Sequence, residues 1–306
     1  MSRDPGTEAM DVRRQLFAIA YRMVGSASDA EEIVQEAHFR LERALAGGTE
    51  VESTPAYLTT VTTRLAIDHL RSARVARESY VGTWLPEPLL TEPDPSEHAE
   101  MADSLSLSFL VLLETLSPVE RAVFLLREVF DYPYDQIAQI VDKSEANCRQ
   151  VFSRARRRID DGKPRFEVSR EERDKLTATF LQAAQEGDVD ELVELLAADA
   201  AFYGDGGGKA LAVPAPVFGR ARVARLLAGF FQRYRDIGGR LAPALVNGEP
   251  GLLGFDANDR LINVFALDIA DGITQTVRSI INPDKLAHLG YPLSDVARID
   301  HRDTPP

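Results

Sequence analysis

Three helix signals lie between residues 116 and 159, where the chain reads LSPVERAVFLLREVFDYPYDQIAQIVDKSEANCRQVFSRARRRI. Ser117-Pro118-Val119-Glu120 combines an N-cap serine, a first-turn proline and a capping-box glutamate, so a helix begins there. A short apolar helix around Ile137–Val141 comes next, and Asp142-Lys143-Ser144 separates it from a last helix over residues 145–159. A short helix, a tight turn and a basic helix together predict a helix-turn-helix.

The last of these helices has an apolar face and a polar face. On a helical wheel the apolar residues share one side, which we expect to be buried: Cys148, Val151, Phe152, Ala155 and Ile159. The other side presents amide, hydroxyl and guanidinium groups: Asn147, Arg149, Gln150, Ser153, Arg154 and Arg157. In a major groove amides pair with adenine and guanidinium groups with guanine, and the later arginines would reach phosphates. We predict a DNA-reading helix; the alternative is a solvated basic helix with no nucleic-acid role.

Charge is segregated along the chain. The 306 residues carry a net charge of −13, and such acidity by itself disfavours binding to nucleic acid. Between Arg77 and Arg121 nine acidic residues occur without any Lys or Arg, whereas between Lys143 and Arg165 eight basic residues outnumber three acidic ones. The basic face is therefore local, and the overall acidity hides it.

Two all-α domains are expected, over residues 10–79 and 103–165, and the second contains the helix-turn-helix. In the first, apolar residues from Val12 to Met23 recur at helical spacing, and Ser28-Asp29-Ala30-Glu31 has the pattern of a capping box for the next helix. Thr54-Pro55 then opens a third helix, with Thr as its N-cap, that continues to Arg77.

The segment between these domains, residues 80–102, is rich in proline and acidic side chains. We expect a linker that proline stiffens and charge extends. Such a polyanion can occupy a basic nucleic-acid channel of a partner; the alternative is an ordinary solvated tether. Trp84, the chain's only tryptophan, is more readily explained by docking into a pocket than by exposure.

From about residue 170 the pattern changes from helices to strands. Two helical stretches precede strand-like runs, of which Leu261–Asp268 and Ile273–Ile281 are the clearest, with turn signals at Asn247-Gly248 and Asp271-Gly272. Residues 170–290 are expected to form an α+β domain whose helices pack on one face of a curved sheet.

Composition limits the remaining possibilities. No apolar run approaches the length of a membrane span and the charged N-terminus has no signal-peptide core, so we expect a cytoplasmic protein. Cys148 is the only cysteine, which excludes an internal disulfide and a cysteine-based zinc site, and we expect no metal or cofactor. The predicted fold class is multidomain: two all-α helical domains, then a C-terminal α+β domain, with a tail over residues 291–306 whose last six residues, HRDTPP, we expect to be frayed.

Two further segments matter beside residues 116–159: DAEEIVQEAHFRLERA (Asp29–Ala44) and PAYLTTVTTRLAIDHLRSAR (Pro55–Arg74). In this order the three segments resemble regions 2 and 4 of bacterial extracytoplasmic-function (ECF) RNA polymerase sigma factors. The remaining half of the chain resembles a SnoaL-like (NTF2-like) domain that one sigma subgroup carries at its C-terminus. The motifs WLPEP from Trp84, DGGGK from Asp205 and NPDKL from Asn282 are similar to motifs of that subgroup.

The resemblance implies a promoter-specificity subunit that binds core RNA polymerase, recognises the −10 and −35 elements of promoter DNA, initiates transcription and has no active site of its own. Carried over position by position, the polymerase contacts fall on Asp29, Glu32, Gln35 and Glu36. The −10 reader corresponds to Thr62, Thr63, Arg64, Asp68, Arg71 and Arg74. In the −35 reader Cys148-Arg149-Gln150 replaces the usual Val-Lys-Ser, which leaves the −35 sequence open.

Three roles are open for the C-terminal domain. The first is regulation of sigma activity in cis through the linker and two rim loops: Trp84, Pro86, Asp205, Gly206, Gly207, Gly208, Lys209, Asn282, Pro283, Asp284 and Lys285. In that role Lys209 and Lys285 would face the acidic linker. The alternatives are sensing of a small-molecule ligand, and a cyclase or hydrolase that uses Asp205, Asp268 or His288 as acid and base. Spacing fixes no pair among these three, and Asp205 fits equally well as a turn residue.

Overall fold

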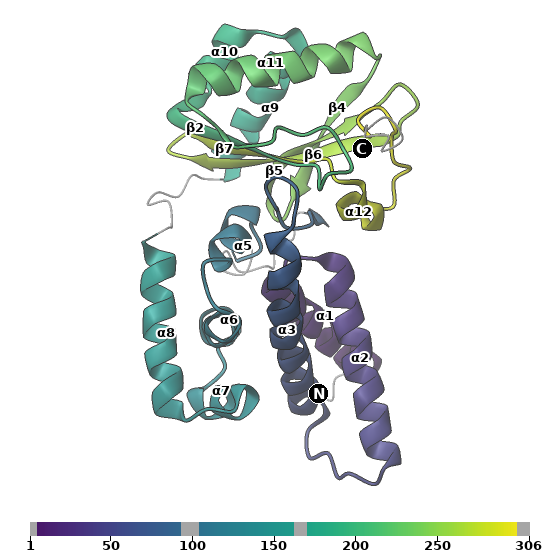
Figure 1. Cartoon of the computed structure of the whole chain (residues 1–306), viewed down its shortest axis with the longest axis vertical. Coiled ribbons are helices and arrows are strands. Elements are labelled where there is room, and N and C mark those ends of the chain that lie inside the picture. The colour runs from purple at the N-terminus through teal and green to yellow at the C-terminus, as the bar shows by residue number, and fades with distance from the viewer. Residues whose placement is uncertain (1–4, 93–103, 162–169, 299–306) are drawn as a thin grey trace. The chain divides into compact units, whose positions relative to one another are not determined.

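The computed structural model describes residues 5–92, 104–161 and 170–298, and the chain divides into two compact units (Figure 1). Unit 1 combines Met1–Glu78 with Phe109–Lys163, and unit 2 combines Ser79–Ser108 with Pro164–Pro306. The described part of the expected linker therefore belongs to the C-terminal unit. Residues 93–103, with the rest of the linker's acidic residues, lie outside the described residues.

Unit 1 is all-helical, as the sequence predicts. Its elements are α1 (Pro5–Val24), α2 (Ala27–Ala46), α3 (Thr54–Glu78), α6 (Pro118–Phe124), the π-helical turn η1 (Leu125–Val129), α7 (Tyr134–Val141) and α8 (Glu145–Asp160). Helix α5 (Leu107–Leu113) begins in unit 2 and ends in unit 1. Helices α7 and α8 with the turn between them form the predicted helix-turn-helix.

The observed N-cap residues agree with the sequence prediction for α6 but not for α2 and α3. The capping box at Ser117 is present, with Glu120 N–H donating to the serine hydroxyl and the glutamate accepting from Ser117 N–H. The prediction for α2 was wrong: Ser26, not Ser28, is its N-cap and accepts from Asp29 N–H at 3.1 Å. Gly25 ends α1 with a positive φ of 71°, so the chain enters α2 already at Ser26. Likewise Ser53, not Thr54, accepts the N–H of the first turn of α3.

The apolar face of α8 is confirmed as part of the unit 1 core. Cys148, Val151, Ala155 and Ile159 are buried, and the half-buried Phe152 ring stacks 6.1 Å from the ring of Phe124. Burial raises the pKa of the Cys148 thiol, which keeps it a neutral core group.

Unit 2 contains a seven-stranded sheet in the order β1-β4-β5-β6-β7-β2-β3. The strands are β1 (Leu90–Thr91), β2 (Leu196–Asp205), β3 (Val217–Phe218), β4 (Arg240–Val246), β5 (Glu249–Phe255), β6 (Leu261–Ala270) and β7 (Ile273–Ile280). Only the β2–β7 pair is parallel. Strand β1 comes from the expected linker, so the sheet begins with a segment that the sequence pattern assigns to a tether.

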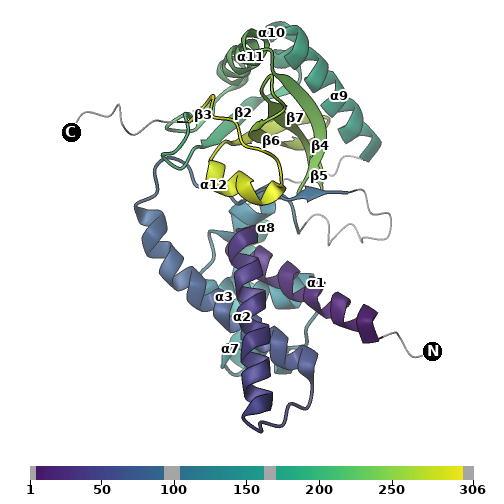
Figure 2. The ribbon, with the colours of Figure 1, turned by 90° about the vertical axis from the view of Figure 1, so that its right-hand side faces the viewer.

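Helices cover one side of this sheet. In Figures 1 and 2, α9 (Arg170–Glu186), α10 (Val189–Glu194) and α11 (Arg220–Asp236) lie on one side, and the short α12 (Pro283–Leu286), continued by the 3₁₀ turn η2 (Ala287–Leu289), lies on the other. Between helices and sheet, the Phe231 ring packs 6.2 Å from Phe180 and 5.8 Å from Phe265, in a core of buried apolar side chains. The predicted α+β architecture is confirmed.

Both predicted two-residue turns are confirmed. Asn247-Gly248 joins β4 to β5 and Asp271-Gly272 joins β6 to β7, with positive φ at all four residues, as type I′ hairpins require. The described part of the predicted tail is attached to the domain, because Leu211 N–H donates to Ala297 O and the Ser294 hydroxyl donates to Asp256. Residues 299–306 lie outside the described residues.

Within the described ranges, no helix combines the length and the hydropathy that a membrane span requires.

Candidate functional site

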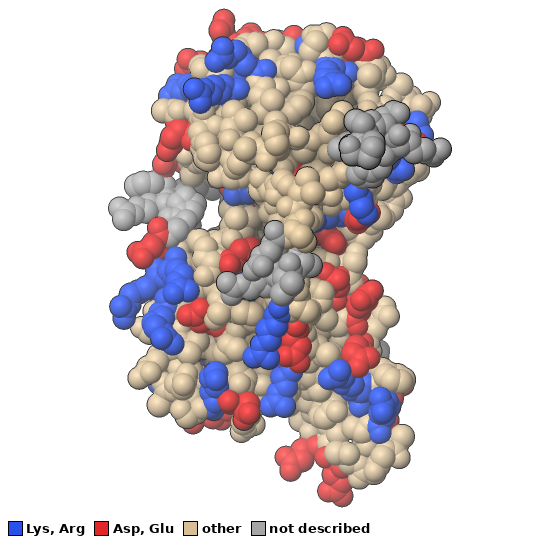
Figure 3. Space-filling model, viewed as in Figure 1, with Lys and Arg blue, Asp and Glu red and all other residues tan. Residues whose placement is uncertain are grey.

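Helix α8 presents the predicted base-reading side chains to solvent. Ser144 caps it by accepting from Asn147 N–H at 3.3 Å, and every predicted −35 residue is exposed: Asn147, Arg149, Gln150, Ser153, Arg154 and Arg157. Figure 3 shows Lys and Arg side chains gathered over this helix. Arg149 is oriented by an ion pair with Glu145 at 2.9 Å and lies 4.8 Å from the Tyr134 ring centroid.

The remaining arginines of α8 divide into two groups. Arg156 pairs with Glu128 at 3.8 Å and Arg158 with Glu120 at 3.4 Å, so both are engaged inside unit 1. Arg154 and Arg157 have no ion-pair partner among the residues that the structure describes. The unpaired side chains are the ones free to reach phosphates, which matches the predicted polar face.

Helix α3 differs from the sequence prediction. Thr62 and Thr63, which the resemblance assigns to the −10 reader, are each 0% exposed, so in this conformation neither side chain can contact DNA. Arg64 is turned toward the helix-turn-helix, where its guanidinium donates to the carbonyls of Gln139 and Ile140 at 2.8 Å each. These carbonyls end α7, where unpaired acceptors favour a cation.

The other predicted −10 residues remain at the surface or undescribed. Asp68 and Arg71 are exposed and pair with each other at 2.9 Å. Arg74 lies on α3, but its side chain falls outside the described side chains.

Two more polar contacts join the N-terminal helices to the second half of unit 1. The Tyr132 hydroxyl lies 3.2 Å from Thr59 Oγ1 and accepts from Gln15 Nε2 at 3.1 Å. The buried Arg121 guanidinium donates to Met23 O at 2.6 Å and pairs with Glu114 at 2.9 Å. These contacts link residues far apart in the sequence, which the local sequence of α3 does not reveal.

A groove of about 650 Å³ lies between α2 and α3. All four residues predicted to contact polymerase line it: Asp29, Glu32, Gln35 and Glu36. Phe39, which sequence reasoning missed, lines the same groove and is 53% exposed. The sequence does contain a hint of this role: Phe39 follows Asp29, Glu32 and Glu36 at helical spacing, so it lies on the same face of the helix. The groove thus combines an acidic rim with one apolar anchor.

In unit 2 the two rim loops meet the linker at a buried ion pair. Asp205, at the end of β2, is 0% exposed and lies 2.7 Å from Lys285 Nζ on α12, which is 6% exposed. Asp205 also accepts from Leu85 N–H at 2.8 Å and from the Tyr80 hydroxyl, and Lys285 donates to Leu85 O. The view of Asp205 as a turn residue was wrong, because its carboxylate binds another part of the chain.

Two aromatic rings of the linker enclose the Lys285 ammonium. Nζ lies 4.3 Å from the Trp84 ring centroid and 4.9 Å from that of Tyr80. Burial, then the negative charge of Asp205, raises the pKa of the Tyr80 hydroxyl, so it remains a donor. Cation–π contacts and a buried ion pair therefore hold the linker against the rim.

The lysine prediction needs correction. We expected Lys209 and Lys285 to face acidic linker residues, but Lys285 pairs with Asp205 of its own domain, and Lys209 pairs with Asp284 at the surface. Around Lys285 the linker contributes the Leu85 carbonyl and the rings of Tyr80 and Trp84, while its Glu87 carboxylate lies 3.7 Å from His288 Nδ1. Pro86 is buried, Trp84 is half-buried and Asn282 donates to the Tyr80 hydroxyl at 3.0 Å.

The glycines of the DGGGK motif allow this close approach, and one substitution tests that. A Cβ on Gly207 would overlap the Asn282 amide and meet the Tyr80 hydroxyl at 2.9 Å. Gly207→Ala is therefore expected to lower the free energy of unfolding by about 2–3 kcal/mol in urea titrations. Gly272→Ala is the control, since Gly272 has a similar φ of 72° with nothing within 4 Å of the built Cβ. Equal losses would show that backbone strain, not packing on the linker, is responsible.

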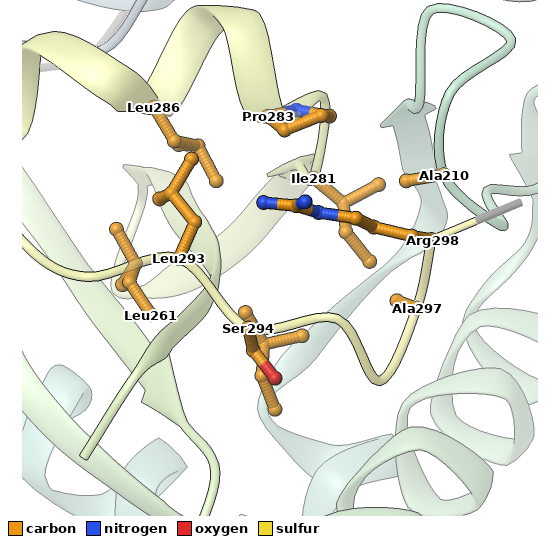
Figure 4. Close-up of a pocket in the computed structure, with 10 residues that line it drawn as sticks. Ala210, Leu261, Ile281, Pro283, Leu286, Leu293, Ser294, Ala297 and Arg298 are labelled. Atoms are coloured by element: carbon orange, nitrogen blue, oxygen red, sulfur yellow. The ribbon is translucent and has the colours of Figure 1, made fainter. Parts of the chain in front are cut away.

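The three residues considered for catalysis lie in separate interactions. Asp205 pairs with Lys285, Asp268 pairs with Arg278, and His288 Nε2 lies 2.8 Å from Pro88 O. The cavity in Figure 4, lined mainly by apolar side chains such as Leu261 and Leu286, has a volume of about 10 Å³. That is room for about one water molecule and not for an organic substrate. Among the described residues no cluster of His, Cys, Asp and Glu could hold a metal ion.

Comparison with known proteins agrees with this arrangement. Two family models match, Sigma-70 region 2 over residues 9–75 and Sigma-70, region 4 over residues 106–159. The chain is 36% identical over 295 residues to the ECF RNA polymerase sigma factor SigJ of Mycobacterium tuberculosis, covering 93% of each chain. It is 33% identical over 287 residues to the probable ECF sigma factor SigI of the same organism, covering 92% of this chain and 95% of that one.

A solved structure extends the similarity to the whole architecture. The crystal structure of the extracytoplasmic function sigma factor SigJ of Mycobacterium tuberculosis matches with a TM-score of 0.74 at 34% identity, covering 94% of this chain and 99% of that chain. Because this similarity runs through both sigma-70 regions and the C-terminal α+β domain, the protein belongs to the extracytoplasmic-function RNA polymerase sigma factors, which are transcription regulators and not enzymes.

Proposed function

We propose that this sigma factor binds core RNA polymerase through the α2–α3 groove, reads the −10 element with α3 and the −35 element with α8, and initiates transcription in the cytoplasm. The observation that carries the polymerase-binding part is the groove itself, which gathers the predicted acidic contacts around an exposed phenylalanine. An exposed aromatic anchor with a polar rim is the usual make-up of a protein-binding surface.

The exposed face of α8 supports −35 recognition, and its residues divide into those expected to read bases and those expected to contact phosphates. Arg149→Ala and Gln150→Ala are expected to change the preferred −35 sequence, because each contact with a base edge is worth about 1–3 kcal/mol. Arg157→Ala is expected to weaken binding to all −35 sequences equally, because a phosphate contact carries no sequence information. Holoenzyme affinity for a library of −35 variants measures both effects. Parallel losses for all three variants on every sequence would contradict this division.

The packing inside unit 1 supports weak promoter binding by the chain alone. The Arg64 guanidinium is hydrogen-bonded to carbonyls at the end of α7. Thr62 and Thr63 are buried, and their hydroxyls have no hydrogen-bond partner among the described residues. An unsatisfied buried hydroxyl costs about 1–3 kcal/mol, so the packing around α3 carries a penalty. We infer that region 4 moves off α3 in the holoenzyme, and that Arg64 reaches the −10 element only then.

The C-terminal domain acts in cis in this proposal. Asp205 and Lys285 hold the backbone of Leu85, a residue of the segment that connects the two DNA-reading regions. Whatever loosens or tightens this contact alters the connection between regions 2 and 4 without any catalysis.

A further inference from the structure

The two type I′ hairpins of unit 2 differ in one respect that turn chemistry does not explain. Asp271, at the first turn position of the β6–β7 hairpin, is exposed. Asn247, at the same position of the β4–β5 hairpin, is 0% exposed, although the two residues have nearly equal φ values of 56° and 53°. A hairpin tip normally projects into solvent, so a buried one has a partner.

The partner of Asn247 is the linker, at two places. Its Oδ1 accepts from Leu89 N–H at 2.8 Å, and its own N–H donates to Leu89 O at 2.8 Å. Its Nδ2 donates to Leu105 O at 3.0 Å. Leu89 and Leu105 stand on either side of residues 93–103, so one side chain holds both ends of that part of the linker.

The attachment at Leu89 continues into the sheet through neighbouring contacts. Strand β1 pairs with β4 in the register Leu90 to Val246 and Thr91 to Leu245. The next hairpin residue, Gly248, donates its N–H to Thr91 Oγ1 at 2.9 Å. At the Leu105 end, where no strand pairing occurs among the described residues, the Asn247 amide contacts the linker through Leu105 O.

Among asparagine, aspartate and glycine, only asparagine satisfies both ends. The carboxamide offers an acceptor to Leu89 N–H and a donor to Leu105 O, whereas a carboxylate has no donor and glycine has neither group. Asn, Asp and Gly all suit the left-handed turn position, so the turn alone does not require asparagine. The requirement comes from the two linker contacts.

We propose that Asn247 is a positioning residue that fixes where the chain leaves unit 2 for region 4, and thereby limits the spacing between −10 and −35 elements that the sigma factor accepts. Helix α5 starts two residues after Leu105, and the region 4 match begins at residue 106. Because Asn247 holds both Leu89 and Leu105, the chain passes from region 2 to region 4 through one fixed point of unit 2, and a fixed connection permits fewer separations of two bound DNA elements. The proposal rests on the proposed −10 and −35 recognition.

The test compares Asn247→Gly with Asp271→Gly. Both variants keep a residue suited to the type I′ turn, and only the first removes the linker contacts. Hydrogen exchange at Leu89 N–H reports the attachment in the chain alone, and run-off transcription from promoters with spacers changed by one or two base pairs reports the function. Asn247→Asp is a third variant, which keeps an acceptor for Leu89 and loses the donor to Leu105.

For Asn247→Gly we expect Leu89 exchange to rise about fivefold, as for the loss of one hydrogen bond, and activity at off-optimum spacers to rise by a similar factor relative to the optimum. Asn247→Asp should protect Leu89 yet broaden the spacer profile, and Asp271→Gly should change neither. Unchanged Leu89 exchange, or a spacer profile that stays narrow after Leu89 is released, would overturn the proposal while leaving promoter recognition intact. Absence of initiation by the unmodified chain at every spacer would instead refute the proposed function.

Discussion

Replacing Asp205 by alanine is expected to lower the free energy of unfolding of unit 2 by about 3–5 kcal/mol, because it leaves a buried ammonium group without its carboxylate. Lys285 is 6% exposed and lies 2.7 Å from Asp205 Oδ2. The same substitution removes the acceptor for Leu85 N–H and for the Tyr80 hydroxyl. Trp84, the only tryptophan, lies against Lys285, so its fluorescence during urea titration at pH 7 reports this unit directly.

Two further variants separate ion pairing from other causes. Asp284→Ala breaks the surface pair with Lys209, in which both side chains are more than half exposed, and should cost distinctly less than Asp205→Ala. The double variant Asp205→Leu with Lys285→Met should recover much of the loss, since apolar side chains of similar size replace a buried pair at little cost. A loss below about 1 kcal/mol for Asp205→Ala would show that the pair does not hold the linker.

The second large effect concerns polymerase binding. Phe39→Ala should weaken binding to core RNA polymerase about 30-fold, because an aromatic anchor in the middle of an interface contributes about 2 kcal/mol or more. Phe39 lines the α2–α3 groove and is 53% exposed in the chain alone. Titration of labelled core enzyme measures the dissociation constant.

Leu45→Ala is the matched control on the same helix. Leu45 is also 53% exposed but is not among the residues that line the groove, so its removal should change the affinity less than twofold. Equal effects of the two substitutions would move the polymerase contact away from the groove.

Local signals predicted much of the fold. The Ser117 capping box, the apolar face of α8 and the hairpins at Asn247-Gly248 and Asp271-Gly272 all depend on neighbours within a few residues, and all are present in the structure. The choice of Ser28 over Ser26 failed because both serines fit a capping pattern, and the end of α1 at Gly25 decides between them.

Long-range packing could not be predicted in the same way. Thr62 and Thr63 look like surface residues of a polar helix, yet both are fully buried within unit 1. Leu90–Thr91 sits among prolines and acidic residues, and becomes a strand only because β4 offers a free edge. Asn247 carries an ordinary hairpin signal, and its second role depends on chain segments far away in sequence.

The candidate sites also combine features that the sequence predicts with features that depend on long-range packing. The resemblance to sigma factors selected the four groove residues and the exposed face of α8, but the exposed Phe39 needed the structure. The rim residues Asp205 and Lys285 were selected together with the linker, whereas their pairing with each other, with Leu85 between them, follows from the fold alone.

The most direct test of the account measures promoter binding and initiation by the purified full chain, with and without core RNA polymerase, on a library of genomic fragments. With core enzyme we expect initiation at a small set of fragments that share −10 and −35 elements, and the chain alone should bind those same fragments at least about tenfold more weakly, because α3 is covered in unit 1 and overall charge disfavours duplex DNA. Equal binding with and without core enzyme, or no initiation from any fragment, would contradict the account.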